Sequence, residues 1–150
     1  MASRHNYKNI EVWKKARVLV KDIYVVTAKF PDNERFGLVA QFRRAMVSVV
    51  LNIAEGSGRT TNKEFSKFLD NAYGSALEVE SLIFLSLDLG FISEVVHDEL
   101  LEKISEVLRM IKGFQAQLDK TPGFLKSVVL ILGFGFSILG SWFSVLSSKI

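Results

Sequence analysis

The sequence predicts an all-α protein, an antiparallel up-down-up-down four-helix bundle followed by an apolar C-terminal tail. Four successive segments repeat apolar residues at alternating three- and four-residue steps, which is the period of an amphipathic helix. Short connections separate these segments, so consecutive helices are expected to be antiparallel. The chain has 150 residues, 49% of them apolar, which is enough for one domain with a large core.

The first segment is expected to form a helix that ends shortly before Pro31. Proline disfavours the α conformation in the preceding residue, so the helix should end near Lys29 or Phe30. Residues 31–37 then form a loop. The inner stripe of this first helix consists of Val12, Ala16, Leu19, Ile23, Val26 and Phe30.

The second helix is expected to run into two glycines. Gly56 and Gly58 follow its last apolar residue, and both tolerate the left-handed backbone that often ends a helix. A tight turn should follow. The inner stripe consists of Val39, Phe42, Met46, Val49 and Ile53.

The third helix begins with a capping-box pattern. Thr61 and Glu64 have the spacing at which a hydroxyl and a carboxylate each satisfy a free backbone N–H. Gly90 should end this helix. Glycine inside a helix costs about 1 kcal/mol relative to alanine, so Gly74 is expected to have a packing reason. The inner stripe consists of Phe65, Leu69, Ala72, Ala76, Val79 and Ile83.

The fourth helix is expected to be capped by Ser93. Its inner stripe consists of Leu100, Ile104, Val107, Ile111, Phe114 and Leu118. Further apolar residues lie beside or off the inner rows, namely Phe36, Phe68, Phe84, Leu85, Leu87, Leu101 and Leu108. Some of them should widen the core, and others should form a second apolar face of the kind that marks a subunit interface. A homo-oligomer is therefore expected.

The domain organisation is predicted as a bundle over residues 7–119, a linker over 120–126 and an apolar tail over 127–148. The tail contains no charged residue, and a helix of its length would cover the roughly 30 Å hydrocarbon core of a membrane. It is interpreted as a transmembrane helix, as a buried segment that shields the bundle, or as an appended sequence of no selected structure. The N-terminus lacks the apolar core of a secretory signal, so a cytoplasmic protein is expected, membrane-associated if residues 127–148 insert.

Charge is strongly polarised along the chain, although the formal net charge is only +3. Residues 1–67 hold 13 Lys and Arg against 6 Asp and Glu, whereas residues 68–119 hold 3 against 10. The two halves are expected to neutralise each other within the bundle, to attract neighbouring subunits, or to present a basic face to nucleic acid.

A nucleic-acid interface is the functional hypothesis with the most support from the residues. Lys14, Arg17 and Lys21 are spaced three and four apart, which gives the first helix a basic strip. Cations on such a surface release counterions from phosphates, so binding would be salt-sensitive and largely independent of sequence. The candidate residues are Lys14, Arg17, Lys21, Arg43, Arg44, Arg59, Lys63 and Lys67.

Residues that indicate catalysis are scarce. There is no cysteine, and no HExxH, GxSxG or phosphate-binding loop occurs. His97 stands beside Asp98 and Glu99, and we interpret it as a solvated surface group, because consecutive residues of a helix point in different directions and do not converge on a metal. No catalytic residue, cofactor or metal is predicted.

The Asn-Ile-Ala-Glu-Gly sequence at the end of the second helix is expected to be structural. Asn52 and Glu55 lie three residues apart on one helical face, and Arg59 follows just beyond the turn. We expect these side chains to form a polar knot between the second and third helices. The motif residues are Asn52, Glu55, Gly56, Gly58 and Arg59.

From about Tyr7 to Leu118 the chain resembles the four-helix-bundle family encoded in intervening sequences of bacterial 23S rRNA genes (S23-type). The stretches that carry the resemblance are EVWKKARVLVKDIY, FPDNERFGLVAQFRRAMVSVVLNIAEGSGR, EFSKFL, GSALEVE and LGFI. The accessory proteins of diversity-generating retroelements are related to this family, and they bind nucleic acid and a reverse transcriptase. The resemblance implies a homopentameric bundle in the bacterial cytoplasm, with RNA or DNA and a protein such as a reverse transcriptase as partners.

The expected function is that of a non-catalytic, oligomeric protein that binds RNA or DNA electrostatically as a scaffold or accessory factor. The alternative is a structural oligomerisation or protein-docking module without nucleic-acid binding, tethered to a membrane if the tail inserts. The placement of the basic residues discriminates between them. Cations that face the acids of the fourth helix would favour docking, and cations on an exposed rim would favour nucleic acid.

Overall fold

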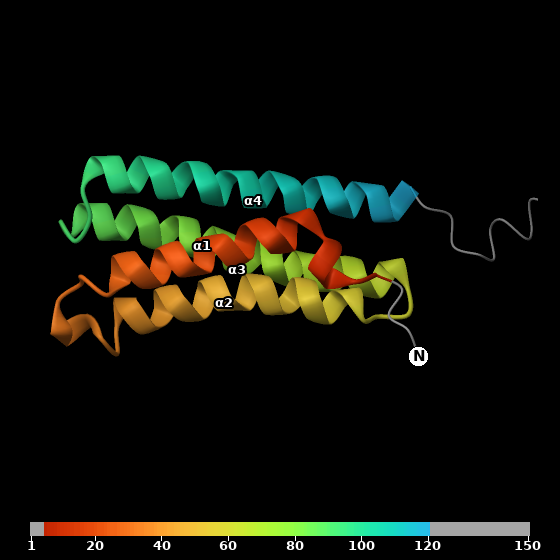
Figure 1. The fold of residues 1–150 in the computed structure, drawn as a ribbon, viewed down its shortest axis with the longest axis horizontal. Coiled ribbons are helices and arrows are strands. Elements are labelled where there is room, and N and C mark those ends of the chain that lie inside the picture. The colour runs from red at the N-terminus through yellow and green to blue at the C-terminus, as the bar shows by residue number, and fades with distance from the viewer. Residues whose placement is uncertain (1–4, 121–150) are drawn as a thin grey trace, which may run out of the picture. The chain divides into compact units, whose positions relative to one another are not determined.

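The computed structural model describes residues 5–120, which form an antiparallel four-helix bundle (Figure 1). The fold class predicted from the sequence is confirmed, and no strand occurs within the described range. The predicted tail over 127–148, and the linker beyond Lys120, lie outside the described residues. The elements are η1 (Tyr7–Asn9), α1 (Glu11–Thr27), η2 (Asp32–Glu34), α2 (Leu38–Ser57), α3 (Asn62–Asp88) and α4 (Glu94–Lys120).

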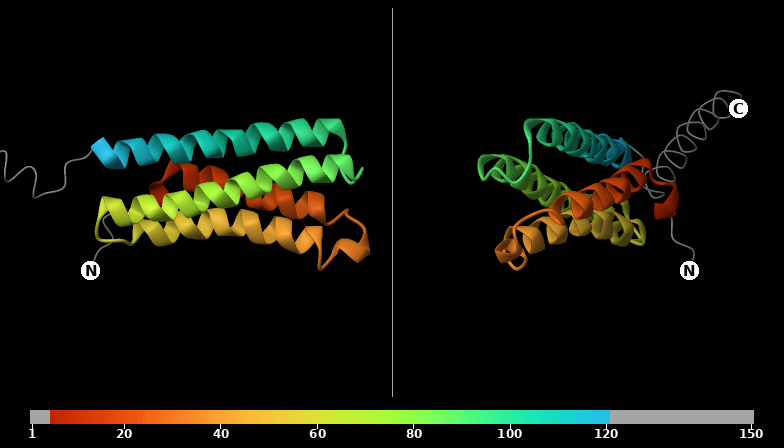
Figure 2. Two further views of the ribbon diagram at one scale, coloured as in Figure 1. Left: turned by 180° about the vertical axis from the view of Figure 1, so that it is seen from behind. Right: turned by 60° about the vertical axis from the view of Figure 1, so that its left-hand side comes forward.

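The core is formed by apolar side chains from all four helices, which lie side by side in the views of Figure 2. Nearly every residue of the predicted inner stripes is buried, and the exceptions, Val26 and Phe114, are partly buried and pack against the core. The buried residues outside the predicted stripes are Thr27, Ala45, Gly56, Ser57, Leu82, Ser86, His97, Leu108 and Gln115.

Helix α1 ends at Thr27, so the prediction that it reaches Lys29 or Phe30 is wrong by two or three residues. The N–H groups of Lys29 and Phe30 donate to carbonyls three residues earlier, at 3.1 and 3.4 Å, which closes a turn instead of extending the α-helix. The Phe30 side chain nevertheless remains in the core, with its ring centroid 5.2 Å from that of Phe91.

Two predicted caps are confirmed. Thr61 Oγ1 accepts from the backbone N–H of Glu64 at 3.2 Å, and the Glu64 carboxylate accepts from the N–H of Thr61 at 3.3 Å, which completes the capping box. Ser93 Oγ accepts from the N–H of Val96 at 3.4 Å. After α3, Gly90 adopts a φ of 71°, a left-handed conformation that suits glycine.

The left-handed ending predicted for α2 is wrong. Gly58 has a φ of −83°, and the N–H groups of Gly58 and Arg59 donate to the carbonyls of Glu55 and Gly56 at 3.1 and 3.0 Å. Gly56 is required for a different reason, which is close packing. A Cβ at this position would lie 2.5 Å from Phe65 Cδ2 and 2.7 Å from Phe68 Cβ, so α3 approaches α2 here more closely than a side chain permits.

The packing reason predicted for Gly74 is not found in the described residues. A Cβ built at Gly74 would meet nothing within 4 Å, and the residue is exposed on α3. The small-residue position that matters to the packing between α2 and α3 is therefore Gly56.

His97 is buried, so its interpretation as a solvated group is wrong. Only 8% of the residue is exposed, its ring packs against that of Phe84 with centroids 5.0 Å apart, and Nδ1 lies 2.8 Å from Asp98 Oδ1. The physical reason is periodicity, because His97 precedes Leu100 by three residues and Ile104 by seven, on the inner face of α4.

The apolar residues off the inner rows divide as expected between core and surface. Leu108 is buried, whereas Phe68, Leu87 and Leu101 are half-buried. The exposed ones are Phe36, Phe84 and Leu85, at 90%, 46% and 47%. Among residues 5–120, no helix has an apolar stretch long enough to cross a membrane.

Ion pairs at the surface join α1 to α4. Lys15 Nζ lies 3.1 Å from Glu106 Oε1, and Lys103 Nζ donates to Asp22 Oδ2 at 2.8 Å. The hydrogen bond to Asp22 raises the pKa of Lys103 above its usual 10.5, although partial burial opposes the shift. On the other side of α4, Gln115 Nε2 donates to Ser66 O and Asp70 Oδ1 of α3 at 3.1 and 2.8 Å.

Gly56→Ala is expected to destabilise the bundle by about 1–3 kcal/mol, because the added methyl overpacks the contact with the phenyl rings of α3. Urea denaturation at one fixed protein concentration measures this change. The matched control is Gly74→Ala, which adds the same methyl to open space and should stabilise α3 by about 0.5–1 kcal/mol. Equal effects of the two substitutions would contradict the assignment of the close contact to Gly56.

Lys103→Met is expected to reduce stability at pH 7 by up to about 1 kcal/mol, as for other exposed ion pairs. Since the folded-state pKa is raised, this contribution is fully present below pH 10.5 and is lost as the pH rises through the folded-state value. The difference in unfolding free energy between wild type and variant should therefore shrink as the pH is raised above 10.5. A difference independent of pH would show that packing, not charge, supplies the effect.

Candidate nucleic-acid interface

The three candidate cations of α1 lie on its exposed surface. Lys14 Nζ is 2.6 Å from Glu11 Oε1 of the same helix, and 46% of the lysine side chain remains exposed. The Arg17 guanidinium lies over the Trp13 ring, 5.3 Å from its centroid. Within the described residues, neither Arg17 nor Lys21 forms an ion pair with a carboxylate.

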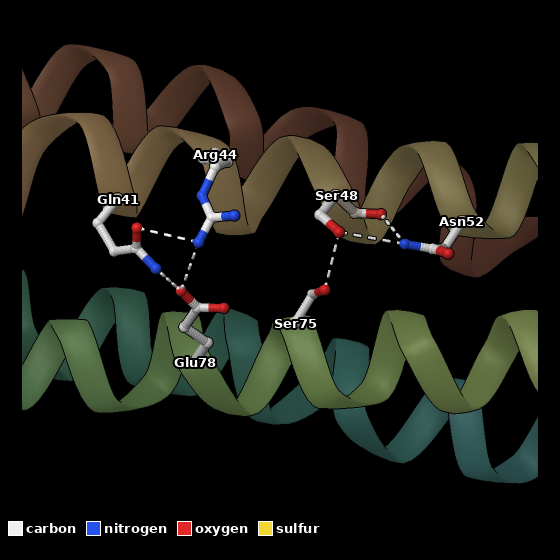
Figure 3. A network of polar contacts seen from close by, with 6 residues as sticks. All are labelled: Gln41, Arg44, Ser48, Asn52, Ser75 and Glu78. Carbon is white, nitrogen blue, oxygen red and sulfur yellow. Dashed lines mark hydrogen bonds and ion pairs between the residues drawn. The ribbon is translucent and has the colours of Figure 1, made fainter.

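The neighbouring arginines of α2 point to different helices. Arg43 Nε donates to Thr27 Oγ1 at 2.9 Å, and its guanidinium lies over the Tyr24 ring, 4.6 Å from the centroid. Both contacts are on α1. Arg44 faces α3, where its guanidinium lies 3.8 Å from Glu78 Oε1 (Figure 3). The structure therefore separates the pair and assigns Arg43 to the α1 side.

Around Arg44, polar side chains of α2 and α3 form a seam (Figure 3). Gln41 receives a hydrogen bond from Arg44 at 3.0 Å and donates to Glu78 of α3. One turn further along, Ser48 and Ser75 are joined by a 2.9 Å hydrogen bond. These bonds satisfy the polar groups with each other, and Arg44 is in addition ion-paired. The seam therefore joins α2 and α3, while 72% of the Arg44 side chain remains exposed.

The remaining candidate cations lie near the turn between α2 and α3. Arg59 pairs with Glu55, and its guanidinium lies 4.3 Å from the centroid of the Phe68 ring. Lys63 and Lys67 are exposed on the first two turns of α3, and no ion pair joins either to a carboxylate of residues 5–120. Seven of the eight candidates thus lie on three helices and Arg59 lies in the turn between α2 and α3, so the eight do not form one group.

The predicted polar knot is only partly present. Glu55 and Arg59 pair, and Arg59 reaches α3 through Phe68, so they join the end of α2 to the start of α3. Asn52 is not part of this contact. Its Nδ2 donates to Ser48 O at 2.9 Å and to Ser48 Oγ at 3.1 Å, which places it in the seam of Figure 3.

Four cations, Lys14, Arg17, Arg43 and Arg44, were expected to discriminate between nucleic-acid binding and protein docking. In the described residues, none of them forms an ion pair with an acid of α4. Lys14 pairs within α1, Arg44 pairs with α3, and Arg17 and Arg43 contact aromatic rings. The pairs between α1 and α4 use Lys15 and Lys103 instead. Mutual neutralisation of the basic and acidic halves therefore leaves most of the α1 strip free of the α4 acids.

Aromatic side chains beside these cations were missed in the sequence. Trp13 and Arg17 are one helical turn apart, and this spacing was a signal that they would meet. Tyr24 and Arg43 come from different helices, so only their tertiary contact reveals the pair. Residues 5–120 contain no group of three His, Cys, Asp or Glu side chains that is arranged to hold a metal ion.

Comparison with solved structures identifies a similar fold. A crystal structure of a protein with unknown function from the S23 ribosomal protein family of Bacteroides thetaiotaomicron VPI-5482 superposes with a TM-score of 0.65 at 19% identity. The match covers 73% of this chain and 99% of that chain. No curated protein matches the sequence.

The amino-acid sequence also matches a family model. Residues 8–113 match the model described as 23S rRNA-intervening sequence protein, and the matched range covers all of α1, α2 and α3 with most of η1 and α4. It includes the Asn52 to Arg59 motif and the basic strip of α1. The chain therefore belongs to the family of 23S rRNA-intervening sequence proteins.

Proposed function

We propose that this protein is a non-catalytic, oligomeric scaffold or accessory factor that binds RNA or DNA electrostatically. The observation that carries the proposal is the state of the α1 cations. Lys14, Arg17 and Lys21 are exposed on one helix and make no pair with the acids of α4. Lys14 pairs with an exposed carboxylate of its own helix, an interaction that is weak in water and is readily exchanged for a phosphate.

The affinity of such a surface comes mainly from counterion release. Each phosphate contact contributes about 0.7–0.9 to the slope of log affinity against log salt, so a few contacts on one subunit give weak, salt-sensitive binding. An oligomer that repeats the surface would bind one nucleic acid at several points and gain avidity. We therefore propose that oligomerisation and nucleic-acid binding act together, in the cytoplasmic setting that the family resemblance implies.

Exposed apolar residues favour a second candidate function, protein docking. Val18 and Val25 on α1 and Leu51 on α2 are 57%, 54% and 60% exposed, and Phe36 before α2 is 90% exposed. Side chains of this kind are typical of surfaces that meet another protein. A pentamer, which the resemblance to the 23S rRNA intervening-sequence family implies, and a reverse transcriptase partner, of the kind that the related retroelement accessory proteins bind, would each use such contacts.

The basic strip is tested with the substitutions Lys14→Gln, Arg17→Gln and Lys21→Gln combined in the full-length protein. Fluorescence anisotropy against generic structured RNA and duplex DNA across a salt series measures affinity and salt slope. Removing three phosphate contacts should lower the magnitude of the slope by about 2–3 and weaken binding most at low salt. Circular dichroism should show unchanged helix content, because all three side chains are exposed.

A matched control removes three cations from the acidic helix, by Lys103→Gln, Arg109→Gln and Lys112→Gln. It changes net charge by the same amount but should leave most of the salt slope intact. Equal losses in the two variants would show that only net charge matters. An oligomer that binds neither nucleic acid at low salt would favour the docking function instead.

A further inference from the structure

Cations and aromatic rings alternate along the side of α1 that faces α2. Arg17 lies over Trp13 at 5.3 Å, and Arg43 lies over Tyr24 at 4.6 Å. The Tyr7 ring meets the Trp13 ring edge-on with centroids 4.9 Å apart. The first pair lies within α1, and the second joins α1 to α2, where the Tyr24 side chain is exposed beside the Arg43 guanidinium. We call Trp13, Arg17, Tyr24 and Arg43 the aromatic stripe.

We propose that the aromatic stripe binds single-stranded nucleic acid in preference to duplex. This inference rests on the proposed function and specifies the form of its ligand. Bases of a single strand are free to stack on tyrosine rings and on guanidinium planes, while neighbouring lysines hold the phosphates. In a duplex the base faces are already stacked on each other, so only the cations of the stripe contribute.

Exposure makes Tyr24 the principal stacking position. It is 44% exposed although the Arg43 guanidinium covers part of its ring, whereas Trp13 is half-buried against the core. Arg43 is held in place by the hydrogen bond from its Nε to buried Thr27, so its planar group is ordered before a ligand arrives. Stacking of a base there therefore costs little conformational entropy of the protein side chains.

Charge around the stripe suits a phosphate backbone. Arg17, Lys21 and Arg43 form no ion pair with a carboxylate in the described part of the chain. Trp13 and Tyr24 are eleven residues apart, about 16 Å along a helix at 1.5 Å per residue. At about 3.4 Å per stacked nucleotide, this distance corresponds to about five nucleotides.

The test measures binding of full-length protein to an unstructured oligonucleotide of about ten nucleotides, twice the length of the stripe. RNA and DNA versions are used, each alone and annealed to its complement, at one low salt concentration. The expected result is that either single strand binds about tenfold more tightly than its duplex. Tyr24→Leu should weaken single-strand binding by about tenfold and change duplex binding by less than about twofold, since it removes the stacking ring but none of the cations, and the Arg43 guanidinium keeps its hydrogen bond to Thr27.

The matched control is Tyr24→Phe, which keeps the ring and should retain single-strand affinity within about twofold. Thermal melting followed by circular dichroism checks that both variants fold. Two results would overturn the proposal that the aromatic stripe prefers single strands. One is duplex binding as tight as single-strand binding, and the other is an effect of Tyr24→Leu that is absent or equal on both ligands. Either result would leave the proposed function in place. Absence of binding to every nucleic acid would overturn the proposed function itself.

Discussion

The burial of four apolar stripes against one another is the constraint on which the other features of this molecule depend. Each helix places its largest inner side chains, such as Phe42 and Ile104, out of contact with water, and burial of a side chain of this size contributes about 1.5–3 kcal/mol. Once these stripes are paired, the rotation of every helix about its axis is fixed. The directions of the surface side chains are then fixed as well, because their positions follow from the same 3.6-residue period.

The contact at Gly56 shows how narrow the tolerance of this packing is. The end of α2 approaches the phenyl rings of α3 so closely that even a methyl group is excluded. The family motif stands at this point, with Glu55 and Arg59 paired beside it and Arg59 lying over Phe68. The motif therefore secures the turn that sets α2 and α3 side by side, and the polar seam of Figure 3 continues their contact along the helices.

The proposed nucleic-acid surface consists of side chains that this packing leaves outside the core. With α1 oriented by its core residues, Lys14, Arg17 and Lys21 are directed to solvent, and Arg43 is carried to the α1 side by its bond to Thr27. The acidic residues of α4 lie on a different helix, which is joined to α1 by the pair of Glu106 with Lys15 and by the pair of Lys103 with Asp22 of α1.

The helices, their caps and the distribution of charge can be predicted from the order of the residues, because these features follow from local rules. The period of the apolar residues identified the four helices and almost all of their buried residues. The capping residues identified the start of α3 and the cap at Ser93. The charge polarity and the basic strip of α1 are likewise visible in the order of the residues. Each of these features depends on neighbours within about one or two helical turns.

Contacts between side chains of different helices cannot be predicted from local rules and become visible in the folded protein. The burial of His97, the separation of Arg43 from Arg44 and the pairing of Arg43 with Tyr24 depend on the rotation and register of neighbouring helices. The same holds for glycine, since Gly56 is packed against α3 and Gly74 faces open space, although both are small residues within helices. Composition and spacing do not carry this information, because contacts between residues far apart in the chain are set by the packing of the whole core.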